Sequence, residues 1–337
     1  MKALVAMSGG VDSSVCAYLA KMAGYECIGV TMKLCKKDLN STDASDAFKV
    51  CRKLGMEHIT MDCTSEFKDK VIQNFIDSYE MGATPNPCIV CNRHLKFGLL
   101  MEKAVELGCD VLVTGHYARI QDGKLLKAKD IKKDQSYVLY PIDKQKLNNI
   151  YLPLGDYTKD EVRAIAEREG FVTARKSDSQ DICFVLDGDY ASVISEYTGR
   201  NYPDGNFVDT SGNVLGTHKG IIRYTIGQRK GLGIAFGKPM YVMGKNTEKN
   251  EVILCSDEEL FSRELTATDF NMLVPFDGSI RAKAKVRYNQ TEQDAEIIRM
   301  EDSRVRVVFD TEQRAIARGQ SVVVYDGEVV VGGGIIE

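Results

Sequence analysis

The chain has 337 residues, of which 44% are hydrophobic, and this is enough for two or three domains with buried cores. Its formal net charge of −4 and its pI of about 5.8 give no overall indication of nucleic-acid binding. The apolar opening ends at Met7, too early for a secretory signal, and no run reaches the roughly 18–20 apolar residues that cross a bilayer. Ten cysteines without a secretion signal predict reduced thiols, so we expect a cytoplasmic protein.

The opening predicts a strand over residues 2–7, a glycine turn and a helix over residues 13–23, with Val15, Leu19 and Met22 on one face. A helix that begins after such a turn offers free N–H groups to an anion. The Walker lysine and the G-x-G-x-x-G spacing are both missing. A tight turn after the first strand of an α/β protein is the alternative. With Ser8, Asp12 and Ser13 included, SGGVDS resembles the signature of the PP-loop ATP pyrophosphatases, which adenylate a substrate oxygen.

The rest of the first half alternates strands with helices. Strands are expected at 26–34, 57–61 and 110–114, and helices at 43–54, 66–80 and 93–107. A later helix, 158–169, begins with a capping box at Thr158 and Glu161. This order predicts an α/β fold with a doubly wound parallel sheet, helices on both faces and ligands at the carboxyl ends of the strands.

Two cysteine segments point to sulfur chemistry. In ATPNPCIVCNRH (83–94), the prolines predict a non-helical loop and Asn92 the start of a helix, whose N-terminus would lower the pKa of the thiols of Cys88 and Cys91. An accidental C-x-x-C or half of a zinc site is the alternative, although a second C-x-x-C is missing. In KSDSQDICFV (176–185), Cys183 considered alone would be expected to be a buried core residue. Together with Cys91 it suits persulfide transfer, in which one thiol carries sulfur and the other resolves the product as a disulfide.

Past residue 200 the pattern changes to glycine-rich sequence and short alternating strands. RAKAKVRY, RVRVVF and SVVVYDGEVVVGG, all after residue 266, predict a small all-β domain that forms a barrel. Residues 210–247 contain no carboxylate but carry Lys219, Arg223, Arg229, Lys230, Lys238 and Lys245, with His218. The period of two places Arg281, Lys283, Lys285 and Arg287 on one strand face. Such faces are often merely solvated, but two basic patches in an acidic protein favour an RNA backbone.

Taken together, the motifs resemble the family of tRNA-specific 2-thiouridylases over essentially the whole chain. The matching blocks are SGGVDS, TPNPCIVCN, VTGHYAR, KDQSYVLY, SQDICF, YTIGQRKGLG and GEVVVGGGIIE. The resemblance implies a PP-loop domain at 1–198, a small central tRNA-contacting domain at 199–265 and a β-barrel domain at 266–337. It also implies that sulfur replaces oxygen at C2 of the wobble uridine in tRNAs for lysine, glutamate and glutamine. ATP and Mg²⁺ would be used, AMP and pyrophosphate released, and a cysteine desulfurase or sulfur-relay protein would donate the sulfur.

The resemblance also assigns residues. Cys91 would be the nucleophile, and Cys183 would carry the persulfide and form a transient disulfide with Cys91; a transient bond from Cys91 to the base carbon stays open as an alternative. Asn86, Pro87 and Cys88 would meet the target base. The nucleotide would be bound by Ala6, Met7, Ser8, Gly9, Gly10, Val11, Asp12, Ser13, Met32 and Gly115. The tRNA would be contacted by His116, Lys133, Asp134, Gln135, Arg287, Tyr288 and Gln320.

The chain departs from the family pattern at Cys88, where an aspartate is usual, and it has no tryptophan. Cys88, Cys91 and Cys183 could instead hold a [4Fe-4S] cluster with one open iron, which gives an iron–sulfur-dependent thiolase as the alternative. Two other classes are a different PP-loop adenylating enzyme, such as an amidotransferase or a synthetase, and an RNA-binding redox regulator. Release of pyrophosphate with and without tRNA separates these three classes.

Overall fold

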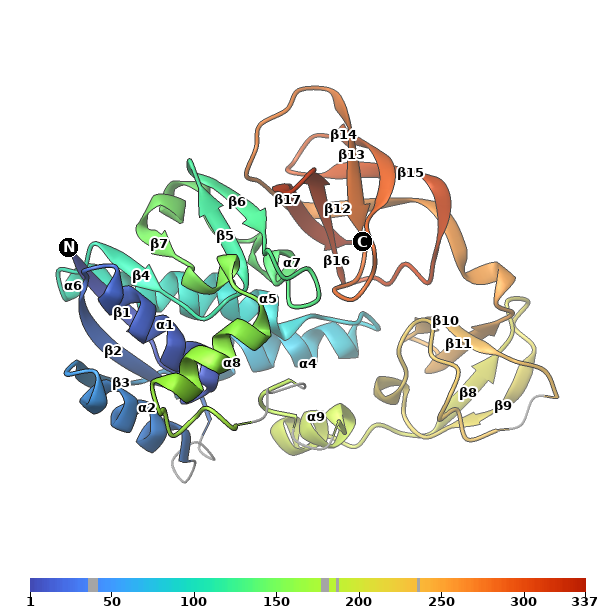
Figure 1. The fold of residues 1–337 in the computed structure, drawn as a ribbon. Helices are drawn as coiled ribbons and strands as arrows, with labels where there is room; N and C mark the ends of the chain where they lie inside the picture. Colours follow the sequence, from blue (N-terminus) through green and yellow to red (C-terminus); the bar gives the residue numbers. More distant parts are fainter. Residues whose placement is uncertain (36–41, 177–181, 186–187, 235–236) are drawn as a thin grey trace.

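The structure is a computed structural model that describes residues 1–35, 42–176, 182–185, 188–234 and 237–337. Three parts follow one another along the chain: an α/β domain, a small central β domain and a C-terminal barrel (Figure 1). Residues 177–181 of the KSDSQDICFV motif and residues 36–38, which follow Cys35, lie outside the described residues. Among the described helices, none is both long enough and apolar enough to cross a membrane.

The α/β domain is built on a five-stranded parallel sheet in the order β3-β2-β1-β4-β7. The strands are β1 (Lys2–Ala6), β2 (Glu26–Lys33), β3 (Glu57–Asp62), β4 (Val111–Val113) and β7 (Ile150–Tyr151). Ala3 and Val5 point to one face, against α1 (Val11–Met22), α2 (Thr42–Lys53) and α8 (Lys159–Arg168). Leu4 points to the other face, against α6 (Leu100–Glu106). Both faces are therefore covered, which confirms the predicted doubly wound sheet.

Two helical segments of this domain carry π-helical turns. One runs through α3 (Thr64–Glu66), η2 (Phe67–Ile72) and α4 (Gln73–Glu80), and the other through α5 (Pro87–Cys91), η3 (Asn92–Leu99) and α6. The expected start of the second helix at Asn92 is wrong, because the helix begins at Pro87. Proline is tolerated at the first helical position, and the Asn86 side chain caps the helix by accepting the N–H of Cys88 at 3.1 Å. The capping box of α8 at Thr158 and Glu161 is confirmed.

Several short elements of this domain were not predicted. They are β5 (Ala118–Gln121), β6 (Lys124–Lys127), α7 (Ser136–Leu139), η4 (Lys144–Asn149), η5 (Pro153–Asp156) and α9 (Tyr190–Thr198). β5 and β6 form a hairpin whose turn residues, Asp122 and Gly123, both have positive φ, at 51° and 68°. β6 then pairs with a barrel strand through Leu126 and Val329, so the hairpin links the α/β domain to the barrel.

The remaining strands form two antiparallel-rich β domains. The central sheet has the order β10-β11-β8-β9, with β8 (Gly205–Val208), β9 (Val214–His218), β10 (Tyr241–Asn246) and β11 (Glu251–Cys255); η6 (Ile221–Arg223) follows β9. After η7 (Glu258–Leu260) come β12 (Phe261–Met272), β13 (Ser279–Lys285), β14 (Gln293–Arg299), β15 (Val305–Arg314), β16 (Ser321–Asp326) and β17 (Val329–Ile336). Because β12 pairs with both β15 and β17, these strands close into a ring, and the predicted barrel is confirmed.

The barrel docks on the α/β domain through specific hydrogen bonds. Thr84 donates its N–H to the carbonyl of Arg318 at 2.8 Å, and the Gln320 side chain donates to the carbonyl of Thr84 at 2.8 Å. Tyr137 donates its hydroxyl to the carbonyl of Ser321 at 2.7 Å. The last barrel strands therefore fix the loop that leads into α5.

Candidate active site

The glycine loop between β1 and α1 lies where the strand order reverses, with β2 on one side of β1 and β4 on the other. Ligands of doubly wound sheets bind at such a point. Gly9 has φ +73°, and a Cβ there would lie 2.2 Å from the carbonyl oxygen of Asp43 at the start of α2. Ser13 and Ser14 each donate a hydroxyl to the carbonyl of Gly10, at 3.1 and 2.8 Å. The loop is therefore tightly constrained and requires glycine at position 9.

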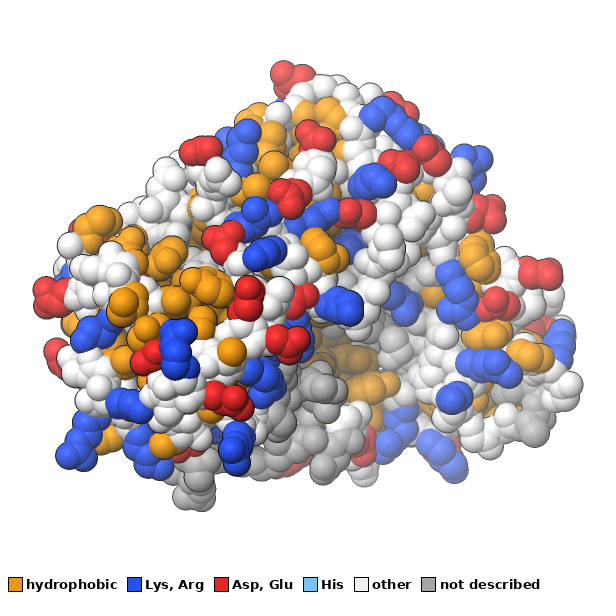
Figure 2. All heavy atoms as spheres, viewed as in Figure 1, with side chains coloured by type: hydrophobic (Ala, Val, Ile, Leu, Met, Phe, Trp, Pro, Cys, Tyr) orange, Lys and Arg blue, Asp and Glu red, His pale blue; other side chains and the backbone are white. Residues whose placement is uncertain are grey.

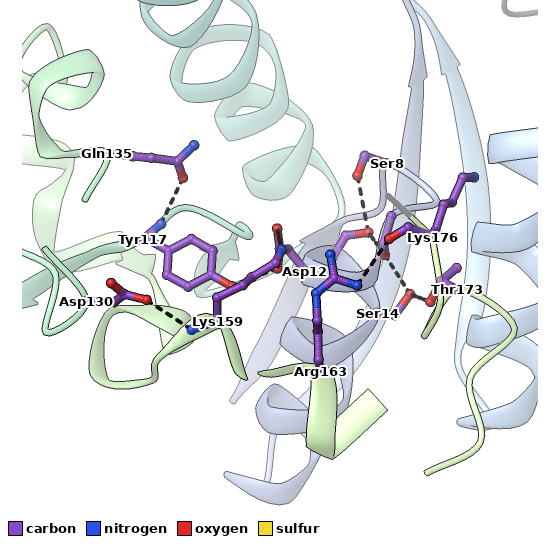
Figure 3. Close-up of polar contacts among 12 residues, drawn as sticks. Ser8, Asp12, Ser14, Tyr117, Asp130, Gln135, Lys159, Arg163, Thr173 and Lys176 are labelled. Carbon is purple, nitrogen blue, oxygen red and sulfur yellow. Dashed lines mark hydrogen bonds and ion pairs between the residues drawn. The ribbon is translucent and has the colours of Figure 1, made fainter. Parts of the chain in front are cut away.

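Asp12, in the first turn of α1, is held by two partners from distant segments (Figure 3). The ammonium of Lys159 lies 2.8 and 2.9 Å from its two carboxylate oxygens, and the hydroxyl of Tyr117 donates to it at 2.8 Å. Lys159 is the first residue of α8 and itself receives support from Asp130, which accepts its backbone N–H at 3.1 Å. The sequence analysis missed Lys159, although it adjoins the capping box that marks the start of α8.

Lys176 is a second cation at the loop that the sequence analysis did not single out. Its ammonium donates to the carbonyl of Gly9 at 3.0 Å and pairs with Asp43 at 2.5 Å and Asp46 at 3.3 Å. Burial lowers the pKa of the Lys176 ammonium, but the two carboxylates outweigh it and raise that pKa. Arg163 of α8 donates to the carbonyl of Lys176 at 3.4 Å. Three basic side chains thus lie at the loop, and two of them, Lys159 and Lys176, already have carboxylate partners there.

Met32 and Gly115 complete the edge of the sheet. Met32 lies at the end of β2 and packs against the clusters on the second face, and Gly115 follows β4. A Cβ on Gly115 would lie 3.4 Å from atoms of Asp12, so this backbone passes close to the start of α1. All ten positions expected to bind the nucleotide therefore lie on or beside β1, β2 and β4. Nucleotide binding by these residues stays a prediction.

Cys91 is only 7% exposed and packs in a cluster with Phe67 and Leu95. Burial raises the pKa of its thiol, while Lys96 lowers that pKa and Cys88 raises it. The expectation of a lowered thiol pKa at this helix start is therefore wrong for Cys91, because burial outweighs the favourable charge and helix end. Cys88, at the second helical position, is exposed.

Cys183 is also exposed, so burial as core filler is excluded for it. Its neighbours Ile182 and Phe184 pack into the cluster that contains Cys91, and the Phe184 ring lies edge-on to Phe75 at 5.2 Å. Although the residue as a whole is exposed, its thiol is desolvated, and this desolvation, followed by the neighbouring Cys91, Cys88 and Cys35, raises the pKa of Cys183 to about 12. The structure therefore brings the two predicted cysteine segments together and adds Cys35, which the sequence analysis did not assign.

The thiols of Cys88, Cys91 and Cys183 are free in the structure. A disulfide between Cys91 and Cys183 is therefore not part of this fold, and its transient formation stays a prediction. Within the described ranges, no group of three His, Cys, Asp or Glu side chains is arranged to hold a metal ion. The geometry gives no support to the iron–sulfur alternative.

The residues expected to meet the target base or to contact tRNA do not all lie together. Asn86, Pro87 and Gln320 meet where the barrel touches the start of α5, since Gln320 donates to the carbonyl of Thr84. His116 is 7% exposed and bonds to Thr114 at 2.8 Å and to Lys96 at 3.3 Å, and burial followed by Lys96 lowers its pKa well below the usual value.

Asp134 and Gln135 also have partners inside the protein. Buried Asp134 accepts the N–H groups of Ala128 and Ser136, at 2.9 and 3.2 Å, and Gln135 accepts the N–H of Tyr117 at 3.0 Å. Lys133, beside them, is half-buried. These side chains support the loop that carries Tyr117, and their contacts with tRNA stay a prediction.

The basic strand face in the barrel is largely engaged by the protein itself. Arg281 forms two hydrogen bonds to Asp310, at 2.9 and 2.5 Å, and Lys283 faces Asp294 at 3.9 Å. Lys285 lies over the rings of Tyr137 and Tyr325, at 5.5 and 5.4 Å.

Just beyond β13, Arg287 is half-buried and donates to the carbonyl of Ala315 at 2.8 Å. Tyr288 is exposed, with its ring edge-on to Tyr137 at 6.0 Å. Arg287 therefore braces the barrel, whereas Tyr288 offers an exposed ring.

Exposed basic side chains without a carboxylate partner are found in the central domain. Arg229 and Lys230 are exposed, and among the described residues no ion pair is found for either, whereas Lys238 is exposed but interacts with Glu259. Lys219 and Arg223 have partners there, Asp204 at 2.7 Å and Asp189 at 3.9 Å. Figure 2 shows a hollow between the three domains with Lys and Arg side chains around it. The exposed basic residues of the central domain are thus better candidates for RNA contacts than the barrel strand.

Comparisons with known proteins agree with this three-part layout. Residues 1–187 match the family described as tRNA methyl transferase HUP domain, 191–256 the tRNA methyl transferase PRC-barrel domain, and 262–336 the aminomethyltransferase beta-barrel domain. The chain is 48% identical to tRNA-specific 2-thiouridylase MnmA of Clostridioides difficile, over 100% of this chain and 98% of that protein. It is equally 48% identical to the MnmA of Acetivibrio thermocellus, over 100% of this chain and 99% of that protein.

Among solved structures, the U34-tRNA thiolase NcsA of Methanococcus maripaludis, solved with its [4Fe-4S] cluster, is 24% identical. The TM-score is 0.37, over 59% of this chain and 64% of that one. This likeness is too distant to bear on a cluster in this chain.

Proposed function

Because the chain belongs to the tRNA-specific 2-thiouridylase family, we propose that it is an ATP-dependent tRNA-uridine 2-sulfurtransferase. The observation that carries the proposal is the convergence of exposed Cys183 with Cys88 and Cys91, two segments far apart in sequence, in a domain whose glycine loop is ringed by cations. The two alternative classes explain less of the site. A PP-loop synthetase that acts on small molecules would not require the thiols, and an RNA-binding regulator would not require the glycine loop.

The first step adenylates O2 of the wobble uridine. The backbone of residues 7–10 and the N-terminus of α1 bind the phosphates of ATP, and Lys159, Arg163 and Lys176 offset their charge. Among the described residues there is no all-protein metal cage, but Asp12 supplies a carboxylate at the loop, and Mg²⁺ is commonly held by one carboxylate together with substrate phosphates. Bound there, Mg²⁺ would neutralise phosphate charge as pyrophosphate leaves.

The second step moves sulfur. Cys183 carries a persulfide, which its exposure allows a donor to load. The thiolate of Cys91 attacks the inner sulfur of Cys183, the S–S bond of the persulfide breaks, and the released hydrosulfide attacks C2 of the adenylated uridine. AMP leaves with the electron pair of the C2–O bond, and Cys91 and Cys183 remain as a disulfide.

We further propose tRNAs for lysine, glutamate and glutamine as substrates, a cysteine desulfurase or sulfur-relay protein as donor, and a cytoplasmic location. The family supports tRNA as the class of substrate, whereas the choice of acceptors, the donor and the location are predictions.

The test is mass spectrometry of nucleosides after incubation of the full chain with tRNA transcripts, ATP, Mg²⁺ and cysteine persulfide. We expect 2-thiouridine and AMP in equal amounts, and loss of 2-thiouridine in Cys91→Ser and Cys183→Ser, because serine has no thiolate at neutral pH. Cys109→Ser, which changes a half-buried cysteine outside the two cysteine segments, is the matched control. Pyrophosphate release without tRNA, or thiolation by either key variant, would contradict the proposal.

A further inference from the structure

Cys88 and Cys91 lie one turn apart at the start of α5. Residues three apart on a helix have Cβ atoms roughly 5–6 Å apart, whereas a disulfide joins Cβ atoms roughly 3.5–4.5 Å apart, so this pair can form a bond after the first turn of α5 adjusts by roughly 1–2 Å. Asn86 accepts the N–H of Cys88 at 3.1 Å, which fixes the first turn without using either sulfur.

The two thiols differ in access. Cys88 is exposed, whereas Cys91 is 7% exposed. An accessible thiol at a helix start and a covered thiol three residues later form the arrangement of a C-x-x-C redox pair, in which a reductant reaches only the first sulfur and exchange with the second is internal.

We infer that Cys88 resolves the Cys91–Cys183 disulfide after each sulfur transfer and so frees Cys183 to be loaded again. The inference rests on the proposed function, because sulfur transfer is what forms that disulfide. It gives Cys88 a role that the aspartate usual at this position cannot perform.

The exchange balances within the chain. The thiolate of Cys88 attacks the sulfur of Cys91, a Cys88–Cys91 bond forms, and the Cys91–Cys183 bond breaks. Its electron pair stays on Cys183, which takes up a proton. Cys88 is thereby oxidised and Cys183 reduced. A dithiol reductant then attacks the exposed sulfur of Cys88, leaves as its own disulfide, and returns Cys88 and Cys91 as thiols.

Cys35 is the competing resolving thiol, because it also lies close enough to Cys183 to affect it. Cys35 is half-buried and comes from a different segment, whereas Cys88 is exposed and shares the first turn of α5 with Cys91. These two features favour Cys88.

The test maps disulfides after one turnover of the full-length enzyme with tRNA transcript, ATP, Mg²⁺ and cysteine persulfide, without reductant. The reaction is stopped with acid, free thiols are alkylated, and the peptides are identified by mass spectrometry. We expect a Cys88–Cys91 disulfide with Cys183 alkylated in the wild type and in Cys35→Ser, and a Cys91–Cys183 disulfide in Cys88→Ser and Cys88→Ala.

A loading measurement uses the same proteins. After one turnover without reductant, Cys183 should take up a second persulfide in the wild type but not in Cys88→Ser, because only the wild type has freed the Cys183 thiol. A second 2-thiouridine requires a dithiol in both proteins, since Cys91 must first be reduced.

A wild-type enzyme that keeps the Cys91–Cys183 disulfide, forms one with Cys35, or makes 2-thiouridine without any disulfide would overturn the role of Cys88. If the wild type makes no 2-thiouridine, the proposed function itself fails, so the two failures are distinguishable.

Discussion

Asp12 shows how one side chain of a short motif is set by residues far from it. Its carboxylate is fixed between Lys159 and Tyr117, so the loop is preorganised before any nucleotide arrives. The same lysine lies over the Tyr117 ring at 5.7 Å. Lys159 is buried, at 8% exposure, which makes its charge costly unless Asp12 or a phosphate compensates it.

We predict that Lys159→Met lowers tRNA-dependent AMP formation about 100-fold, because a preorganised charge at the phosphates is lost. Radiolabelled ATP and thin-layer separation of AMP measure this rate. Asp160→Ala, which removes an exposed carboxylate at the next position of α8, should behave as the wild type. A rate of AMP formation in Lys159→Met within twofold of the wild-type rate would show that Lys159 does not contribute to this reaction.

The cysteine pKa values predict a distinct pH dependence. The pKa of Cys183 is about 12, so the thiol predominates at neutral pH and the thiolate fraction grows with pH up to that value. Alkylation of Cys183 by iodoacetamide should therefore rise about tenfold per pH unit from pH 7 to 10. A peptide thiol with a pKa of about 8.5 levels off above about pH 9 and serves as the reference. A plateau for Cys183 below pH 9, read by mass spectrometry, would contradict the structure.

At the scale of elements, β17 packs closely against the α/β domain at one glycine. Gly333, in the run Gly332–Gly334, lies against Tyr140, and a Cβ there would lie 2.6 Å from that ring and 2.9 Å from the carbonyl oxygen of Val322. Asn271 of β12 donates to the carbonyls of Tyr140 and Ile142 at 2.6 and 2.8 Å beside it. Gly333 therefore serves close packing between domains, whereas Gly332 and Gly334 pack against β12 within the barrel.

We predict that Gly333→Ala costs about 1–3 kcal/mol of stability, as overpacking does in well-filled cores. Gly244→Ala in β10 is the matched control, since its Cβ would meet nothing closer than Ile253 at 4.0 Å, and its effect should stay within about 0.5 kcal/mol. Chemical unfolding followed by circular dichroism measures both. Equal free energies of unfolding for the two variants would show that Tyr140 can move aside without loss of stability.

The sheet of the α/β domain was predictable because its signals are local: apolar strands, helical periodicity and the capping box at Thr158. The hairpin β5–β6 was missed although its turn, Asp122-Gly123, is a known hairpin signal. Lys159 and Lys176 could not be identified as loop partners, because their contacts depend on how α8 and the following segment pack. The direction of the pKa shift of Cys91 was misjudged for the same reason. The start of the helix can be predicted from the sequence, but the burial of Cys91 beside Phe67 and Leu95 depends on tertiary packing.

At the scale of the whole molecule, the barrel and the central domain differ in whether their basic side chains have carboxylate partners. The barrel strand that carries Arg281 and Lys283 pairs these cations with Asp310 and Asp294, while the central domain leaves Arg229 and Lys230 exposed. A cation that already has a carboxylate partner releases fewer counterions when it meets a phosphate. The central domain should therefore dominate the salt-dependent part of tRNA binding.

We predict that Arg229→Glu with Lys230→Glu weakens binding of cognate and non-cognate tRNA alike and reduces the slope of log K against log salt by about 1–2. Lys283→Glu should change the slope less, because Asp294 is its partner. Filter binding at several salt concentrations measures this. A larger change in the salt slope for Lys283→Glu would indicate that the barrel strand is the surface that binds RNA.

The hydrogen bonds between Thr84 and residues 318 and 320 have a consequence for the order of synthesis. The segment that carries Cys88 and Cys91 is made within the first hundred residues, yet the groups that hold the loop before it are made almost last. A nascent chain therefore has its sheet and its cysteines long before the loop ahead of α5 is secured. Chains arrested on the ribosome before residue 318 should be cleaved by added protease near residues 84–86, and completed chains should resist. The loop ahead of α5 would thus be secured only when the whole chain has been made, and equal protection of the arrested chains would refute this.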